Sequence, residues 1–370
     1  MSESEQVQPV SGRIESIDVL RGFDMFWIIG GGAIFASLHK VFNNDITATI
    51  KEQLEHVPWE GFRFEDLIMP LFMFIVGVVM PYSFSRRLER GHGGGRLFAH
   101  VLFRSAVLFV LGMVAQGRLL EFDMSRLHIY CNTLQAIAAG YVIAAAVLLA
   151  LRPAGQAVVC VMLMLVFWGL MALVPAPGST AGDLTPDGNL AIYIDRLVLG
   201  RFQDQTHYTW ILSSMTFGST VLMGVLAGQW LRSGRSGFVK AAGLVAAGAV
   251  CIGAGIVWDM IFPIIKHLWT SSFVMFSGGI CLVLLGLFYL VIDVFGLRRW
   301  AFVFKVIGMN AIFVYMITHL WNFRNLGGVF VRGLDKWLGP WDAFAHAIAG
   351  FALVWLILLY MYRKKSFIKI

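Results

Sequence analysis

Long apolar segments alternate with short polar ones along almost the whole chain. Ten segments are apolar over about 20 residues each, which is the length that a helix needs to cross the hydrocarbon core of a bilayer. They are residues 19–41, 66–85, 97–119, 130–150, 156–175, 209–231, 238–260, 269–293, 301–321 and 342–361. This pattern predicts an all-α, polytopic membrane protein with about ten transmembrane helices in one bundle.

Composition favours the same class. Hydrophobic residues make up 58% of the 370 residues and charged residues only 14%, well below the share in soluble proteins. The net charge of +7 does not indicate a nucleic-acid partner, because Lys and Arg collect in the cytoplasmic loops of membrane proteins. The four cysteines lie in apolar segments without metal-binding spacing, so we expect no metal site.

The positions of the basic residues predict the orientation. If the N-terminus is cytoplasmic, the clustered Arg and Lys residues fall in the short connections after even-numbered spans, as the positive-inside rule requires. An even number of spans then places both termini in the cytoplasm, residues 86–96 inside, and residues 42–65 and 176–208 outside. We divide the chain into a cytoplasmic tail, residues 1–17, and a single transmembrane domain, residues 18–370.

Several features modify this simple picture. Three glycines, Gly30 to Gly32, interrupt the first span and permit a break or a close helix contact. Asp18, Arg21 and Asp24 share one face of that span and can pair, so they form either a structural charge ladder or part of a functional site. Residues 190–200 have the pattern of a short amphipathic helix, and the spacing of Gly224 and Gly228 predicts close helix packing.

A polar segment, residues 56–66, leads directly into the second apolar span. It holds a histidine, three carboxylates and an arginine, and Pro58 and Gly61 argue against a regular helix before Phe64. If the protein performs chemistry, we expect it here. The alternative is a solvated loop with an interfacial Trp59 and His56, because aromatic residues are common at membrane surfaces.

Five motifs in order carry a family resemblance. They are Ser16-Ile-Asp18-Val-Leu-Arg21-Gly22, the segment from His56 through Trp59 and Gly61 to Asp66-Leu67 and Pro70, Lys266-His-Leu-Trp269, Gly308-Met309-Asn310, and Tyr362-Arg-Lys-Lys365. Together they resemble the transmembrane acyltransferases typified by lysosomal heparan-α-glucosaminide N-acetyltransferase and its bacterial relatives. The resemblance covers nearly the whole chain.

The resemblance implies a donor, an acceptor and a catalytic residue. It implies acetyl-CoA, approached from the cytosol, as donor, and a glucosamine-type amine on the outer or lumenal side as acceptor. It also implies that His56 is catalytic, and Asp66 is the nearest residue that could orient it. A homodimer and a bacterial inner membrane, or a lysosomal-type membrane in a eukaryote, are further expectations.

Other polar residues at the helix ends and within the spans are candidates for binding donor or acceptor. Those we select are Asp18, Arg21, Trp59, Gln135, Lys266, Trp269, Arg298, Arg299, Asn310 and His319. Arg86, Arg87, Arg298, Arg299 and Lys305 are candidates for the donor's phosphates, although topology signalling explains all five without a ligand. Departures from the family pattern, such as Ala136 and His207 to Trp210, leave the acceptor sugar open. A sugar or small-solute transporter and a scaffold protein remain alternatives to an enzyme.

Overall fold

The computed structural model describes residues 14–91 and 93–368, and these residues are almost entirely helical. Among them, β-structure is confined to one isolated bridge between Glu60 and Ile265. Most of the predicted N-terminal tail, residues 1–13, lies outside the described residues. The α-helices are α1 (Glu15–Phe26), α2 (Gly32–Phe42), α3 (Asp45–Gln53), α4 (Ile68–Glu89), α5 (Gly94–Ala115), α6 (Thr133–Ala150), α7 (Pro153–Leu173), α8 (Leu190–Leu199), α9 (Ser214–Leu231), α10 (Gly237–Asp259), α11 (Ser271–Tyr289), α12 (Phe302–Gly308), α13 (Ala311–Leu320), α14 (Phe323–Val331), α15 (Asp335–Leu338) and α16 (Asp342–Arg363).

By length and apolar composition, eight helical segments in the described part of the chain could cross a membrane, or nine if the bent pair α12–α13 counts as one span. This confirms an all-α integral membrane protein, with eight or nine candidate spans in the described residues where about ten were expected. The span predicted at 209–231 coincides with α9, which does not meet the same measure. Because α9 is buried among α4, α6 and α7, it need not be as apolar as a helix that faces lipid.

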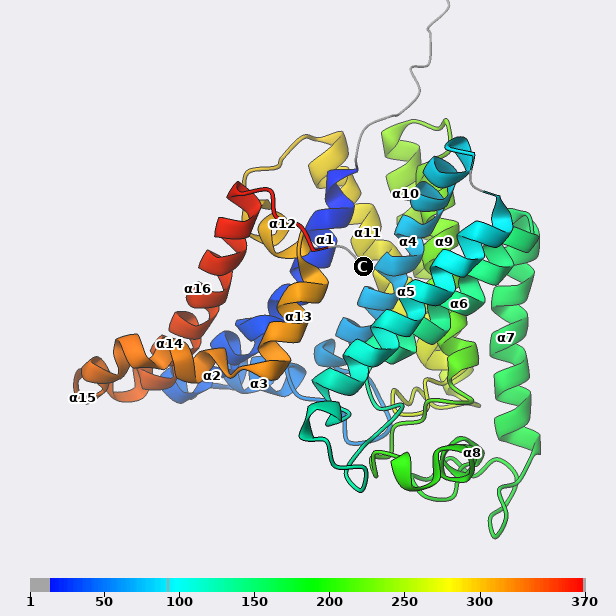
Figure 1. Ribbon diagram of the computed structural model, residues 1–370, viewed down its shortest axis with the longest axis horizontal. Helices are drawn as coiled ribbons and strands as arrows, with labels where there is room; N and C mark the ends of the chain where they lie inside the picture. The colour runs from blue at the N-terminus through cyan, green and yellow to red at the C-terminus, as the bar shows by residue number, and fades with distance from the viewer. Residues whose placement is uncertain (1–13, 92, 369–370) are drawn as a thin grey trace, which may run out of the picture.

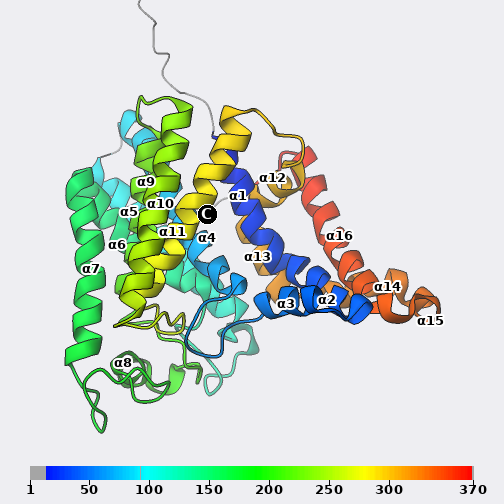
Figure 2. The ribbon, with the colours of Figure 1, turned by 180° about the vertical axis from the view of Figure 1, so that it is seen from behind.

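The helices stand in two neighbouring groups (Figure 1). In one group are α4 to α7 and α9 to α11, and in the other are α1, α12, α13 and α16. Helix α1 packs against both α4 and α11 and so joins the groups. At the lower end of the view, α2, α3, α14 and α15 lie across the direction of the upright helices, and Figure 2 shows the same arrangement from behind.

A glycine produces the turn between α1 and α2. Gly30 has φ of +148° inside the short π-helical stretch Trp27–Gly31, a backbone conformation that side-chain-bearing residues rarely adopt. The interruption expected from the glycine run is therefore confirmed. It redirects the chain from the upright α1 into α2 at the lower end of the molecule (Figure 1).

The span predicted as one helix at 301–321 is broken. The axes of α12 and α13 differ by 77° across Met309 and Asn310. The Asn310 side chain donates to the Ser366 carbonyl at 3.2 Å and accepts from the Ile368 amide at 3.0 Å. A straight helix was the wrong prediction because the partner of this asparagine is the chain beyond α16, which the local sequence does not reveal.

Close packing of α4 on α9 depends on glycine. A Cβ atom added to Gly77 would lie 2.0 Å from the Val221 carbonyl oxygen, and one added to Gly224 would lie 2.0 Å from that of Phe74. A Cβ added to Gly228 would similarly meet the Val78 backbone at 2.3 Å. This confirms the close helix packing expected from the Gly224 and Gly228 spacing.

The connections gather at two ends of the molecule. α3, α8 and the long segments around them lie at the lower end in Figure 1, whereas α1 begins and α16 ends at the upper end, where α4 is also joined to α5. The short helix predicted at 190–200 is confirmed as α8. Which end faces the cytoplasm stays a prediction.

Candidate active site

The loop between α3 and α4 is held against a second, distant loop. The Gly61 amide donates to the Ile264 carbonyl at 2.8 Å, next to the bridge between Glu60 and Ile265. The Arg63 guanidinium donates to the His56 carbonyl within the same loop at 3.2 Å, and to Glu52 of α3 at 2.7 Å. These contacts bring His56 beside the segment that precedes α11.

A buried tryptophan fixes the second loop. Trp269 is 1% exposed, and its indole N–H donates to Thr220 Oγ1 at 3.0 Å. It adopts a left-handed backbone with φ of +53°, and its amide closes a turn onto the Lys266 carbonyl at 3.0 Å. Trp269 therefore anchors the loop in the protein core, and this turn presents the Lys266 side chain to His56.

His56, Asp66 and Lys266 form a triangle of close polar contacts. His56 Nδ1 lies 3.0 Å from Asp66 Oδ1, and Lys266 Nζ lies 3.2 Å from the same oxygen and 3.1 Å from the same nitrogen. The second Asp66 oxygen accepts from the amides of Arg63, at 3.1 Å, and Val57, at 3.4 Å. Lys266 and the two backbone amides donate to Asp66, and His56 Nδ1 is a fourth donor when it carries the proton.

The protonation of Nδ1 decides whether Nε2 of His56, the ring nitrogen outside the triangle, can act as a base. If His56 Nδ1 carries the proton and donates to Asp66, Nε2 is an unprotonated base. If Nδ1 instead accepts from Lys266, Nε2 carries the proton and cannot act as a base. The Lys266 ammonium can donate to Asp66 instead of to His56. The Asp66 carboxylate favours the tautomer with the proton on Nδ1, so Nε2 of His56 can accept a proton.

Burial sets the electrostatics of this triangle. The side chains of Asp66 and Lys266 are 1% and 7% exposed, whereas that of His56 is half-exposed. Burial lowers the pKa of Lys266, and the neighbouring Asp66 carboxylate opposes this effect. A buried pair of opposite charges thus supports a histidine that reaches open space.

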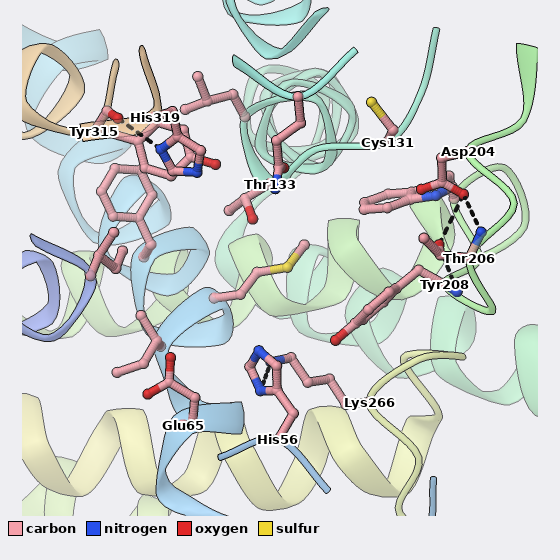
Figure 3. A pocket seen from close by; sticks show the side chains of 17 residues that line it. His56, Glu65, Cys131, Thr133, Asp204, Thr206, Tyr208, Lys266, Tyr315 and His319 are labelled. Carbon is pink, nitrogen blue, oxygen red and sulfur yellow. Dashed lines mark hydrogen bonds between the residues drawn. The ribbon is translucent and has the colours of Figure 1, made fainter. Parts of the chain in front are cut away.

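That space is a cavity of about 370 Å³ at the lower end of the molecule. His56, Glu65 and Lys266 lie in the lower part of the close-up, Asp204, Thr206 and Tyr208 lie to one side, and Tyr315 and His319 lie across from them (Figure 3). The cavity therefore collects residues from loops and helices that are far apart in sequence, and it is large enough for a sugar-sized ligand.

A second cavity of about 550 Å³ lies behind the first. Phe72 and Leu134 line both cavities and form a shared wall. The charged residues of the second cavity are Asp18, Arg21, Arg86 and Arg104. Because Asp18 lies in the first turns of α1 and Arg86 near the end of α4, this cavity belongs to the opposite end of the molecule from His56.

The family model described as "Heparan-alpha-glucosaminide N-acetyltransferase, catalytic" matches residues 13–255. The chain belongs to this family. Among its relatives, heparan-alpha-glucosaminide N-acetyltransferase of Homo sapiens is 26% identical over 427 residues, covering 97% of this chain and 60% of the human protein. That of Mus musculus is 23% identical over 429 residues, covering 97% of this chain and 61% of the mouse protein. The chain thus spans about three fifths of the length of these curated relatives.

The heparan-alpha-glucosaminide N-acetyltransferase family is a family of membrane acetyltransferases, and this chain is one of its members. The matched region contains His56 and Asp66 and ends before Lys266. The family match and the triangle of contacts therefore meet at the same loop, although they rest on different observations.

Some residues expected to bind substrate lie elsewhere. Gln135 is buried in the helix bundle, where its side chain accepts from the Cys131 amide at 2.9 Å and donates to the Phe109 carbonyl at 3.2 Å. Trp59 donates to the Leu184 carbonyl at 3.0 Å and stacks on His267, so it links loops beside the cavity. Asn310 holds the chain after α16, as described above.

Of the cations expected to bind the donor, Arg86 lines the second cavity, whereas Arg87, Arg298, Arg299 and Lys305 line neither cavity. Arg298 is 57% exposed and pairs with Glu15 at 3.4 Å, and Arg299 lies on the surface beside it. By contrast, Asp18 and Arg21, which pair at 3.4 Å, line the second cavity, and His319 lines the first.

Sequence reasoning overlooked several cavity residues. Arg104 lies in the middle of α5, and an arginine inside an apolar span is a functional signal in itself, so this residue could have been found. Glu65 lies next to Asp66, but only Asp66 belongs to the family motif. Tyr208 falls in the stretch His207 to Trp210 that departs from the family pattern, and Asp204 lies shortly before it. Only the folded chain places both residues in the cavity with His56.

Proposed function

We propose that the protein transfers an acetyl group from acetyl-CoA to the amine of an amino sugar, with His56 as the base. The observation that supports this most is that His56, held by Asp66 and Lys266, lines a cavity that shares a wall with a second, arginine-lined cavity. The relatives' name specifies N-acetyl transfer to a glucosaminide. The cavity with His56 takes the amine, and the other takes the donor.

The proposed chemistry follows from the free nitrogen of His56. Attack of an amine on a thioester needs a base close to the nucleophile, and a neutral imidazole serves near physiological pH. His56 Nε2 takes a proton from the attacking nitrogen and gives it to the leaving thiolate. Asp66 acts as the positioning residue, because it holds the Nδ1–H and stabilises the imidazolium that forms during transfer.

The arginine-lined cavity suits the donor. CoA carries phosphates, and charge-assisted hydrogen bonds from guanidinium groups bind phosphates strongly. Arg21, Arg86 and Arg104 all line this cavity, so the phosphates occupy its charged end and the thioester points to the shared wall. With the predicted orientation, the donor enters from the cytoplasm and the acceptor from the outside or lumen.

A direct assay tests the proposal. The full chain in proteoliposomes is given acetyl-CoA and glucosamine, and free CoA is measured with a thiol reagent. We expect amine-dependent CoA release that falls about 100-fold or more in His56→Ala. His207→Ala is the matched control, because His207 lies at the same end and does not line the cavity. Uptake of labelled glucosamine without acetyl-CoA, and no CoA release, would instead indicate a transporter.

A further inference from the structure

The cavity contains a second carboxylate beside the one that holds His56. Glu65 is half-buried and lines the cavity, in the same part of Figure 3 as His56 and Lys266. Both oxygens of Asp66 are occupied by donors, whereas no hydrogen bond or ion pair to the Glu65 carboxylate is found in residues 14–91 and 93–368. Glu65 is therefore available to a ligand.

Another carboxyl group lies behind Glu65. Asp24 of α1 is completely buried, and neither of its oxygens has a hydrogen-bond partner in the described chain. It lies one helical turn before Trp27, whose ring packs edge-on against Phe64 at 4.8 Å between centroids. This contact directs that face of α1 toward the short helical segment Phe64–Leu67, which contains Glu65 and precedes α4.

N-acetylation requires more proton transfer than His56 alone supplies. An aliphatic amine is largely an ammonium ion at neutral pH, since such amines have pKa values near 8 or above. The ammonium must lose one proton before its nitrogen can attack, and the nitrogen loses another as the amide forms. His56 has one free ring nitrogen, because Nδ1 is engaged by Asp66 and Lys266.

We propose that Glu65 is a second catalytic base, which binds the acceptor's ammonium group and removes its first proton. This inference rests on the proposed function. The ammonium gives a proton to the Glu65 carboxylate and becomes a free amine. Its lone pair then forms the C–N bond to the thioester carbon, and the carbonyl electron pair moves onto oxygen.

The remaining steps balance the protons. His56 Nε2 takes the second proton from nitrogen. The electron pair on the oxyanion re-forms the carbonyl as the C–S bond breaks with its electron pair on sulfur, and the protonated His56 gives its proton to the thiolate. The products are the amide and CoA thiol, His56 returns to its starting state, and Glu65 holds one extra proton. Glu65 releases that proton to water through the mouth of the cavity.

Some charged groups around Glu65 oppose its protonation and others favour it. Lys266 and a protonated His56 oppose proton uptake by Glu65, whereas the neighbouring carboxylates favour it. The titratable groups that face it are His56, Lys266, Asp66, Asp24 and Tyr208. Asp204 also lines the cavity, but its Oδ1 accepts from the Thr206 amide and hydroxyl on the side away from His56 (Figure 3).

A pH profile tests this role. The value of kcat/KM for glucosamine is measured between pH 5.5 and 9 in wild type and in Glu65→Gln, using the full chain in proteoliposomes. We expect the variant to lose about 10- to 100-fold at pH 6, where the amine is an ammonium ion. It should approach wild type at pH 9, where the free amine is present in solution and needs no deprotonation.

Two further variants make the result decisive. Glu65→Asp retains a carboxylate and should keep a larger share of the low-pH rate than Glu65→Gln. Glu60→Gln removes a carboxylate from the exposed loop outside the cavity and should leave the profile unchanged. Parallel profiles of wild type and Glu65→Gln, in protein that releases CoA, would overturn this inference alone. A wild type that acetylates no amine would overturn the proposed function as well.

Discussion

Lys266 Nζ lies 3.1 Å from His56 Nδ1, although 210 positions separate the two residues in the chain. Both atoms also approach the same oxygen of Asp66, at 3.2 and 3.0 Å. The base of the proposed reaction is thus supported by a buried ion pair, one member of which comes from a different loop. The stability of this pair and the activity of the histidine can be separated by mutation.

The first prediction concerns Asp66. Asp66→Asn leaves the buried Lys266 ammonium without a counter-charge and should destabilise the protein, on the scale of about 3–5 kcal/mol for breaking a buried pair. It should also lower CoA release about 100-fold, because the amide no longer imposes the productive His56 tautomer. Thermal midpoints in detergent and steady-state rates measure the two effects.

The double variant Asp66→Asn, Lys266→Met separates the loss of stability from the loss of activity. Removing both charges should restore most of the thermal midpoint, since no unpaired buried charge remains. The rate should stay low because His56 still lacks its positioning carboxylate. If restoring the thermal midpoint also restored the rate, Asp66 would have only a structural role.

The second prediction distinguishes two sets of arginines. Arg86→Gln or Arg104→Gln should each raise the apparent KM for acetyl-CoA about 10-fold, because a lost charge-assisted contact costs roughly 1.5–3 kcal/mol. Arg298→Gln and Arg299→Gln make the same change of charge at the surface and serve as controls. The reverse pattern would place the donor outside the second cavity.

The third prediction is a pH dependence of stability that arises at His267. This residue stacks on the ring of Trp59 and also packs against the tilted ring of Tyr208, and its Nδ1 is buried without a partner in the described residues. Burial, and after it the charge of Lys266, lower the pKa of His267 to about 4 from an ordinary value of 6.5. Asp66, His56 and His207 are its other charged or titratable neighbours.

The direction in which stability changes with pH follows from proton uptake by the unfolded and folded chains. As the pH falls below 6.5, the unfolded chain binds a proton at this position and the folded chain does not until about pH 4. The contribution to the free energy of unfolding is therefore complete above pH 6.5 and is lost as the pH falls to 4. His267→Gln should reduce the fall of the thermal midpoint between pH 7 and 4.5 by several degrees. An equal fall in both proteins would exclude His267 as the cause.

The fourth prediction concerns orientation. Lys51 is a half-exposed residue of α3 at the lower end, and Arg90 is exposed at the upper end where α4 is joined to α5. Single cysteines at these positions, in a chain whose four native cysteines are replaced, should react with an impermeant maleimide from opposite sides. We expect Lys51→Cys to react from outside the cell or from the lumen. Labelling of both from one side would contradict the fold.

The sequence predicted those parts of the fold that depend on local patterns. The apolar lengths of α4 and α16 and the break at Gly30 can be read from neighbouring residues. The bend at Asn310 depends instead on the chain after α16, more than 50 positions away. Likewise, α9 is surrounded by protein rather than lipid, and hydropathy alone does not reveal which neighbours a helix has.

The candidate site likewise contains residues that local sequence patterns predict and residues that only the fold brings together. The spacing of His56, Trp59 and Asp66 follows a motif, so these residues could be selected before the fold was known. Clusters of basic residues at span ends are required by topology, and this requirement masks any binding role. Arg298 and Arg86 therefore look alike in sequence, and only the position of Arg86 beside a cavity distinguishes them.

The shared wall of Phe72 and Leu134 has a consequence for the membrane itself. A membrane that stores energy as an ion gradient needs every protein within it to remain electrically insulating. Both side chains are apolar and at most 7% exposed, so they form an apolar barrier between the two cavities. If the acetyl group is transferred at this level, only its two carbon atoms and one oxygen atom need to cross, while sugar and nucleotide stay on their own sides. The gradient is then preserved during each reaction cycle.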